Sequence, residues 1–432
     1  MKNKTLLTVL IFITSCTIVF SQTKIKAIKA GKLIDVISGT VLNNQIILIE
    51  NNKITAIGSS ITIPENAEII DLSKSTVLPG LIDCHTHLSG EPTDDYYGDI
   101  FRKTPIDYAV QAHIFTKRTL QAGFTTCRDL GSSDLIDISL RDAINNGIIE
   151  GPRMLVACFT LSSTGGHADM SGFNPAIKMN SNPDYTGVAD GVDEIRKRVR
   201  NNIKWGADVI KFCATAGVLS EEESVGAPQY SLEEMKAIVD EAHMWERKVA
   251  AHAHGTEGIK RAIIAGVNSV EHCSIVDDET VKLMKEKGTY MVPTMYALDY
   301  VIENFGKKGY PEKIINKAKS IAKQKQEGLV KIIKGGVKIA YGTDASVMPH
   351  GLNGKDFAYL VKAGMTPMQA IQSATVNAAD LLDITAKTGS ITVGKWADII
   401  AVNENPINDI KVLEQVQFVM KDGVVYKNET AK

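Results

Sequence analysis

The sequence predicts an α/β protein: a (β/α)8 TIM barrel with a small β-sandwich domain built from both chain ends. Through the middle of the chain, short apolar strands alternate with amphipathic helical stretches, as in repeated βα units. Both ends instead carry strand and turn patterns. The length of 432 residues also exceeds the usual size of one domain. We therefore expect the small domain at residues 22–76 and 384–432, and the barrel at residues 77–383.

Residues 1–21 are predicted to be a secretory signal peptide. Lys2 and Lys4 precede an apolar run over residues 6–20, which ends in polar residues. The run is short for a membrane-spanning helix, so we expect an exported protein, periplasmic or secreted, with no membrane span after cleavage. Lipid attachment at Cys16 is the less favoured alternative, because the apolar run continues past this cysteine.

Composition narrows the class of partner. The formal net charge is -2, and charges of both signs are interspersed along the chain, so neither a nucleic-acid surface nor a polybasic membrane patch is predicted. A small uncharged or zwitterionic molecule is the better partner. A homo-oligomer is the common outcome for such proteins, and the sequence leaves the oligomeric state open.

Five cysteines of the mature chain are predicted to be buried free thiols. Their odd number and their apolar neighbours disfavour a disulfide framework, although export would permit one. They are Cys84, Cys127, Cys158, Cys213 and Cys273.

The first elements in order are the strands of the small domain. Apolar runs at 32–35, 45–50 and 54–58, with a turn between the last two, predict strands near the start. Near the end, runs at 397–402, 416–420 and 424–426 predict strands again, the last two joined by a hairpin. The two ends are therefore expected to form one domain.

Eight strands are expected in the barrel, with helices between them. A capping box begins one helix at Ser231, Thr366 with Pro367 begins another, and apolar residues recur at helical spacing over 192–203. In a closed parallel barrel the carboxyl ends of all strands converge on one face. The predicted strands end near Asp83, Asp129, Ala157, Lys211, His252, His272, Pro293 and Asp344.

Several of these strand ends carry metal-ligating side chains. His85 and His87 follow the first strand at alternate positions, so both can point to the same ion. The fifth, sixth and eighth strands end at His252, His272 and Asp344. A set of nitrogen and oxygen donors on four strand ends predicts a metal site.

These residues together resemble the amidohydrolase superfamily, and the resemblance covers nearly the whole mature chain. In relatives with two metals, a lysine on the fourth strand is carboxylated by carbon dioxide and bridges the ions; Lys211 lies at that place. An unmodified ammonium has no acceptor, whereas a carbamate supplies anionic oxygens. The alternative is that Lys211 binds a substrate carboxylate.

The resemblance implies a site with two divalent metal ions. His85, His87, Lys211 and Asp344 would hold one ion, and Lys211, His252 and His272 the other. The donors suit zinc, with manganese, cobalt, nickel and iron as alternatives. A hydroxide bridging the ions would be the nucleophile, and Asp344 would carry its proton to the leaving nitrogen.

The loop over residues 161–169 resembles that of Xaa-Pro dipeptidases and ochratoxin-type amidases, which implies cleavage of a dipeptide or an N-acyl amino acid. Imidazolonepropionases share this architecture too, but they resemble His-Ala-Asp-Glu after the fifth strand, where this chain has His252, Ala253, His254 and Gly255 and so lacks the glutamate. We expect His167, Tyr230 and His254 to bind substrate. The alternatives are a solvent-facing loop histidine, a packing tyrosine and a structural hydrogen bond, respectively.

Other functions remain open at this stage. A two-metal site can also hydrolyse a cyclic amide, as in imidazolonepropionases, or a lactone. A noncatalytic barrel that binds a metal or a small molecule is the alternative from a different class.

Overall fold

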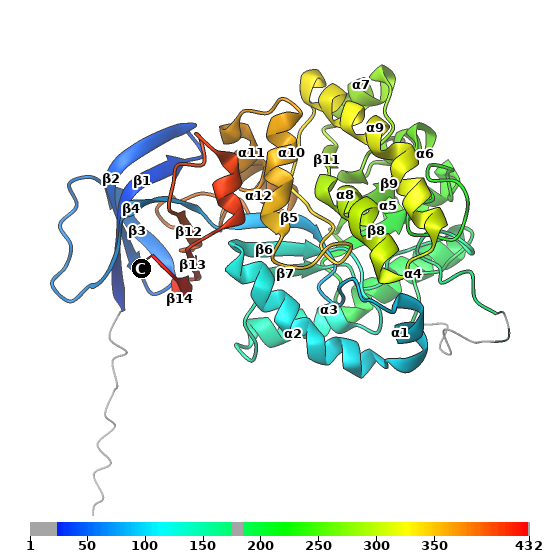
Figure 1. Ribbon diagram of the computed structural model, residues 1–432, viewed down its shortest axis with the longest axis horizontal. Coiled ribbons are helices and arrows are strands. Elements are labelled where there is room, and N and C mark those ends of the chain that lie inside the picture. The colour runs from blue at the N-terminus through cyan, green and yellow to red at the C-terminus, as the bar shows by residue number, and fades with distance from the viewer. Residues whose placement is uncertain (1–23, 175, 177–184, 431–432) are drawn as a thin grey trace, which may run out of the picture.

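The computed structural model describes residues 24–174, 176 and 185–430. The predicted signal peptide and Cys16 lie outside the described residues. The described chain contains one seven-stranded sheet and two smaller parallel sheets, of four and three strands. In Figure 1 the seven-stranded sheet lies at one end of the molecule, and most of the helices surround the parallel strands at the other.

The seven-stranded sheet joins strands from both chain ends. Its order is β14-β13-β12-β4-β1-β2-β3, with β1 and β4 parallel and the other neighbours antiparallel. Blue N-terminal and red C-terminal strands accordingly lie together in Figure 1. The strands are β1 (Ile25–Asp35), β2 (Thr40–Glu50), β3 (Lys53–Gly58), β4 (Glu68–Pro79), β12 (Ile399–Val402), β13 (Phe418–Lys421) and β14 (Val424–Asn428).

Seven of the eight predicted barrel strands are present, in two parallel sheets ordered β5-β6-β7 and β11-β10-β9-β8. Strands β5, β6 and β8 are buried along their whole length, as expected for parallel strands covered by helices. The strands are β5 (Leu81–Thr86), β6 (Phe124–Asp129), β7 (Arg153–Val156), β8 (Val209–Cys213), β9 (Lys248–Ala253), β10 (Ser269–His272) and β11 (Tyr290–Val292).

The eighth predicted strand is not a regular strand. The segment around Asp344 forms isolated parallel bridges, Ile339 with Met291 of β11 and Ala345 with Thr86 of β5. Asp344 has a φ of 61°, in the left-handed region, so the backbone leaves the extended conformation where the strand was expected to end. A further bridge joins Leu161 to Phe212 of β8.

Helices follow most of the parallel strands and cover them. The capping box predicted at Ser231 begins α5, and the helix start predicted at Thr366 begins α11, where Thr366 also forms a capping box. The α-helices are α1 (Tyr96–Arg102), α2 (Pro105–Gln121), α3 (Ile136–Asn145), α4 (Val192–Trp205), α5 (Leu232–Met244), α6 (Thr256–Ala265), α7 (Asp278–Lys287), α8 (Met295–Asn304), α9 (Glu312–Gly335), α10 (Asp356–Lys362), α11 (Pro367–Ser373) and α12 (Val376–Leu381). Short 3-10 helices are η1 (Phe305–Lys308), η2 (Asn353–Lys355) and η3 (Ile410–Glu414).

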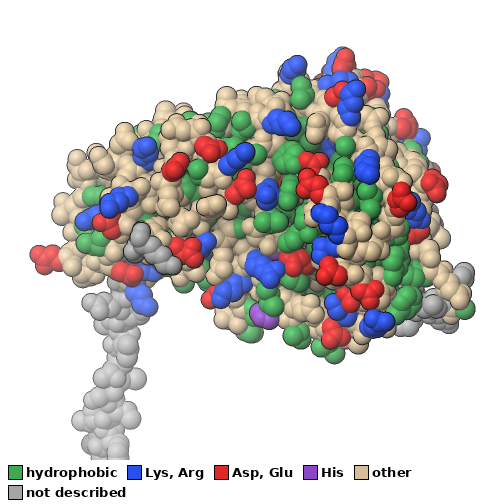
Figure 2. Space-filling model, in the orientation of Figure 1, with side chains coloured by type: hydrophobic (Ala, Val, Ile, Leu, Met, Phe, Trp, Pro, Cys, Tyr) green, Lys and Arg blue, Asp and Glu red, His purple; other side chains and the backbone are tan. Residues whose placement is uncertain are grey.

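The five cysteines of the described chain are buried and free, as predicted. Burial raises the pKa of each thiol, which keeps it protonated and unreactive. No described helix is both long enough and apolar enough to cross a membrane. On the face shown in Figure 2, acidic and basic side chains are mixed, which agrees with the absence of a basic stripe from the sequence.

Ion pairs of Arg153 with one buried and one partly exposed carboxylate connect the small sheet to the parallel strands. Arg153 of β7 donates from Nη1 to Oδ2 of Asp398 (3.0 Å) and from Nη2 to Oδ1 of Asp422 (2.7 Å). Asp398 is 2% exposed and also accepts from the Thr388 hydroxyl at 2.8 Å. The guanidinium stacks on Trp396, with its carbon 4.0 Å from the ring centre.

Replacing Asp398 by alanine is expected to lower the free energy of unfolding by about 3 kcal/mol, because Arg153 and Thr388 would lose a buried acceptor. Urea titration followed by circular dichroism measures the change. Glu404→Ala, an exposed acidic residue close in sequence, is the control and should change stability little. Equal stabilities of the two variants would contradict the role given to the ion pair.

Candidate functional site

The carboxyl ends of the parallel strands surround one cavity of about 270 Å³. Its lining contains every metal-ligand candidate predicted from the sequence, together with two of the three predicted substrate-binding residues. These are His85, His87, Lys211, His252, His272 and Asp344, with His167 and His254. The convergence expected of parallel strand ends is therefore observed.

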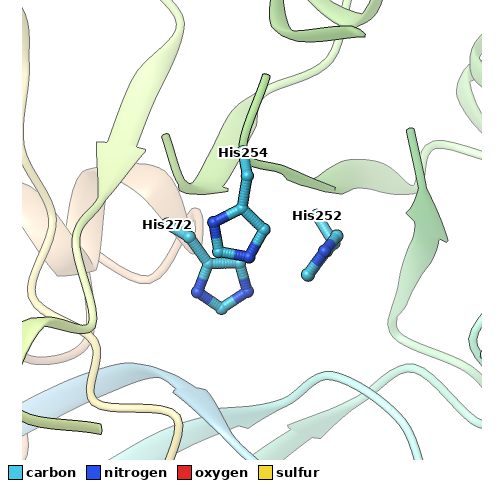
Figure 3. Close-up of side chains that lie close together, drawn as sticks. All are labelled: His252, His254 and His272. Atoms are coloured by element: carbon cyan, nitrogen blue, oxygen red, sulfur yellow. The ribbon is translucent and has the colours of Figure 1, made fainter. Parts of the chain in front are cut away.

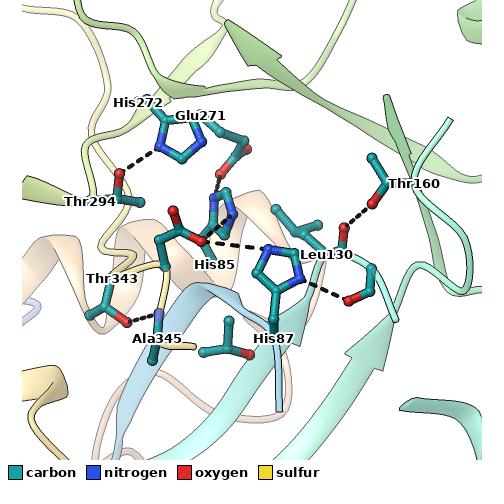
Figure 4. A network of polar contacts seen from close by, with 12 residues as sticks. His85, His87, Leu130, Thr160, Glu271, His272, Thr294, Thr343 and Ala345 are labelled. Carbon is teal, nitrogen blue, oxygen red and sulfur yellow. Dashed lines mark hydrogen bonds and ion pairs between the residues drawn. The ribbon is translucent and has the colours of Figure 1, made fainter. Parts of the chain in front are cut away.

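His85, His87 and Asp344 form the first group of metal-ligating atoms, and these atoms lie within 4.8 Å of one another. Asp344 Oδ1 is 3.4 Å from His85 Nε2 and 3.5 Å from His87 Nε2. Figure 4 shows the two histidines close together. His87 Nδ1 is held by the Gly131 carbonyl at 2.8 Å, which leaves Nε2 facing the cavity. Two imidazoles and a carboxylate aimed at one point are a donor set for a divalent cation.

Glu271 holds the His85 ring from behind. Its Oε2 lies 2.8 Å from His85 Nδ1, and its Oε1 accepts from Arg128 Nη2 at 2.9 Å and from the Ser269 hydroxyl at 2.5 Å. Both charged side chains are buried, and Arg128 Nε donates to the Cys84 carbonyl at 2.7 Å. A carboxylate on the far nitrogen of a histidine fixes the ring orientation and makes the near nitrogen a better ligand.

His252, His254 and His272 form the second group (Figure 3). The His272 Nδ1 pairs with the Thr294 hydroxyl at 2.7 Å, and His254 Nδ1 with the Ser274 hydroxyl at 2.8 Å. His252 Nε2 is buried and has no hydrogen-bond partner among the described residues. A buried lone pair without a donor costs free energy, and a cation in the cavity would satisfy it. This donor set therefore fits a divalent metal ion.

The site histidines are held neutral, the form that binds metals. Burial lowers the pKa of His85, His252, His254 and His272 well below its ordinary value, and neighbouring positive groups lower it further. The pKa of His87 is also lowered by burial, although the Asp344 carboxylate opposes that shift. Neutral imidazoles offer lone pairs instead of repelling a cation.

Lys211 lies in the cavity lining at the end of β8, as the sequence predicted. Its side chain is buried, and burial lowers the pKa of its amine. Lys211 therefore lines the same cavity as the histidines of both groups.

Two of the predicted substrate-binding residues reach the cavity and one does not. The His167 ring stacks on His252 with centres 4.1 Å apart, and its Nδ1 lies 2.9 Å from the Ser220 hydroxyl. Burial, with Lys211 nearby, lowers the pKa of His167 to about 3. Tyr230 lies outside the cavity lining: its hydroxyl donates to the Ala189 carbonyl at 3.1 Å, and its ring packs in the core.

Sequence reasoning missed Glu271, Arg128 and Lys325. Glu271 directly precedes His272 in a buried strand, and a buried acidic residue beside a ligand is a signal that could have identified it. Arg128 is the residue before the last one of β6, and nothing local indicates its partner. Lys325 lies on α9, far in sequence from any strand end, and the packing of that helix brings its side chain to the cavity.

Comparison with known proteins agrees with this geometry. A solved structure described as an Xaa-Pro dipeptidase with bound methionine in the active site is 44% identical, with a TM-score of 0.90, over 94% of this chain and 100% of that one. Ochratoxinase of Aspergillus niger is 36% identical over 94% of this chain and 87% of its own length. Imidazolonepropionase of Fusobacterium nucleatum subsp. nucleatum is 25% identical, over 83% of this chain and 84% of its own length.

The family model described as the amidohydrolase family matches residues 76–426, most of the chain. The match spans every residue of the cavity named above, from His85 to Asp344. The chain therefore belongs to the amidohydrolase family.

Proposed function

We propose that this hydrolase cleaves the amide bond of a dipeptide or an N-acyl amino acid at a site holding two divalent metal ions. The observation that carries the proposal is the pair of three-residue ligand groups facing one cavity. The similar Xaa-Pro dipeptidase was solved with methionine bound, and a free amino acid is a product of either proposed substrate. Ochratoxinase, a second similar protein, supports the same branch of the family.

The proposed ligands are those implied by the family pattern. His85, His87 and Asp344 would hold one ion, His252 and His272 the other, and a carboxylated Lys211 would bridge them. Imidazole and carboxylate donors suit zinc. His254 lies within ligand distance of His252 and His272; we assign it, with His167, to substrate binding.

When bound, the ions would lower the pKa of water and polarise the scissile carbonyl. Asp344 is the proposed proton carrier: its carboxylate takes the proton of the attacking water and passes it to the leaving nitrogen. Its side chain is 16% exposed and opens on the cavity, so it can reach both partners. Glu271 keeps the His85 ring fixed during this transfer.

Three further proposals concern the whole chain. The parallel bridges at Ile339, Ala345 and Leu161 connect the two small parallel sheets, and we propose that the eight segments make one closed barrel. We propose that the barrel spans residues 77–383 and that residues 22–76 and 384–432 form a sandwich-like small domain. We also propose export directed by residues 1–21.

Replacing Asp344 by asparagine should reduce kcat by at least about 100-fold on any dipeptide or N-acyl amino acid that the protein cleaves, since asparagine cannot carry the proton. Steady-state assays of product release measure the effect, and circular dichroism verifies the fold. Asp142→Asn, at a side chain that is 55% exposed, is the matched control and should keep its activity. Undiminished hydrolysis by the Asp344 variant would overturn the proposed mechanism.

Metal analysis tests the two-ion site separately from turnover. Protein grown with added zinc and ¹³C-bicarbonate is expected to contain about two metal ions per chain and a carbamate signal in its ¹³C NMR spectrum. Lys211→Met should lose the carbamate signal and most of the metal, and chelation should abolish hydrolysis until metal is restored. About one metal ion per chain with no carbamate signal would show that Lys211 is not carboxylated. Cyclic amides would then be the substrates to test.

A further inference from the structure

Lys325 is a buried cation in the cavity that the mechanism above does not use. It extends from α9 into the cavity lining and is 2% exposed. Its Nζ donates to the Thr294 carbonyl at 2.7 Å and lies 3.4 Å from the Thr294 hydroxyl. Both of these acceptors are uncharged, so they satisfy the hydrogen-bonding capacity of the ammonium only in part.

The charge of Lys325 lacks a direct counter-charge. Within residues 24–174, 176 and 185–430, no carboxylate forms an ion pair with its Nζ; Asp356 and Asp344 act on it from a greater distance. The Asp356 Oδ1 accepts backbone N–H groups of Met295 and Tyr296, at 2.5 and 3.3 Å. A buried charge without a direct ion pair is costly, so an anion entering the cavity would be favoured at this position.

Apolar side chains line the cavity beside Lys325. Thr294, its hydrogen-bond partner, directly precedes α8, and the next residues of that helix present an apolar surface to the cavity. With two further segments they supply the apolar lining residues that we call the apolar wall, which are Val218, Ala297, Leu298, Val301 and Val347; all of them except Ala297 pack in one apolar cluster. This part of the cavity thus offers one positive charge next to a surface suited to a hydrocarbon side chain.

We propose that Lys325 binds the free carboxylate of the substrate and that the apolar wall receives the side chain next to that carboxylate. The preferred substrate is then an amide whose leaving group is a hydrophobic amino acid with a free carboxylate. This inference rests on the proposed amide hydrolysis and adds a substrate class to it. His254 and His167 remain available to the rest of the substrate, since they line the same cavity.

Matched substrates with and without the carboxylate test the assignment. Wild-type protein should cleave alanyl-leucine with a kcat/KM about 10- to 100-fold above that for alanyl-leucinamide, measured by alanine release, because a charge-assisted hydrogen bond is lost with the amide. In Lys325→Met the preference should fall to about threefold or less, through a loss on the acid alone. A purely structural role would lower kcat/KM for both substrates equally.

Lys317→Met is the matched control. Lys317 lies on the same helix and is also buried, and it donates to the Ser220 and Glu222 carbonyls at 2.9 and 2.6 Å without lining the cavity. This variant should retain the wild-type preference for the acid. Loss of the preference in the control as well would overturn the assignment to Lys325.

Binding of leucine and leucinamide, followed as the shift in melting temperature, gives a readout without turnover. Leucine should stabilise the wild type more than leucinamide does, and this difference should vanish in Lys325→Met. If that variant does not fold, the wild-type protein alone still tests the inference. Equal kcat/KM values for alanyl-leucine and alanyl-leucinamide, with equal melting-temperature shifts by leucine and leucinamide, would overturn it. Cleavage without a preference for the acid refutes only the role of Lys325. Cleavage of neither dipeptide, with leucine binding through Lys325, refutes only the proposed function.

Discussion

The buried ion pair between Arg128 and Glu271 is the interaction on which the site depends. Arg128 leaves the end of β6, binds the Cys84 carbonyl of β5, and pairs with Glu271 of β10. Three strands, from both parallel sheets, are thereby joined inside the protein. Because neither charge can be left alone in a buried interior, the pair fixes the strands relative to one another, and Glu271 then fixes His85.

Backbone conformation at the strand ends also supports the site. His272, Thr294 and Asp344 have φ values of 67°, 46° and 61°, in the left-handed region that residues with a Cβ rarely adopt. Each such residue costs on the order of 1 to 3 kcal/mol, which the surrounding packing must supply. This conformation turns the chain sharply where a strand ends, and the His272 and Asp344 side chains reach the cavity.

Burial gives the cavity its chemistry. It holds the imidazoles neutral, so that five histidines lie in or near ligand distance without mutual repulsion. The same low polarity makes an unpartnered atom costly, as at His252 Nε2, and a charge without a direct ion pair more so, as at Lys325. The proposed metal ions and the proposed substrate carboxylate would therefore occupy neighbouring parts of one cavity.

The sequence by itself determined the candidate ligands at the strand ends, the capped helices and the pairing of strands from both termini. These features follow from short-range rules: alternation along a strand places His85 with His87, and a capping box starts α5 at Leu232. The tertiary structure alone decided which partners support those ligands. Arg128 and Glu271 are separated by more than a hundred residues in the sequence. The Tyr230 side chain packs in the core, and Lys325 reaches the cavity from helix α9. Contacts of this kind depend on how whole elements pack, and no local pattern encodes that packing.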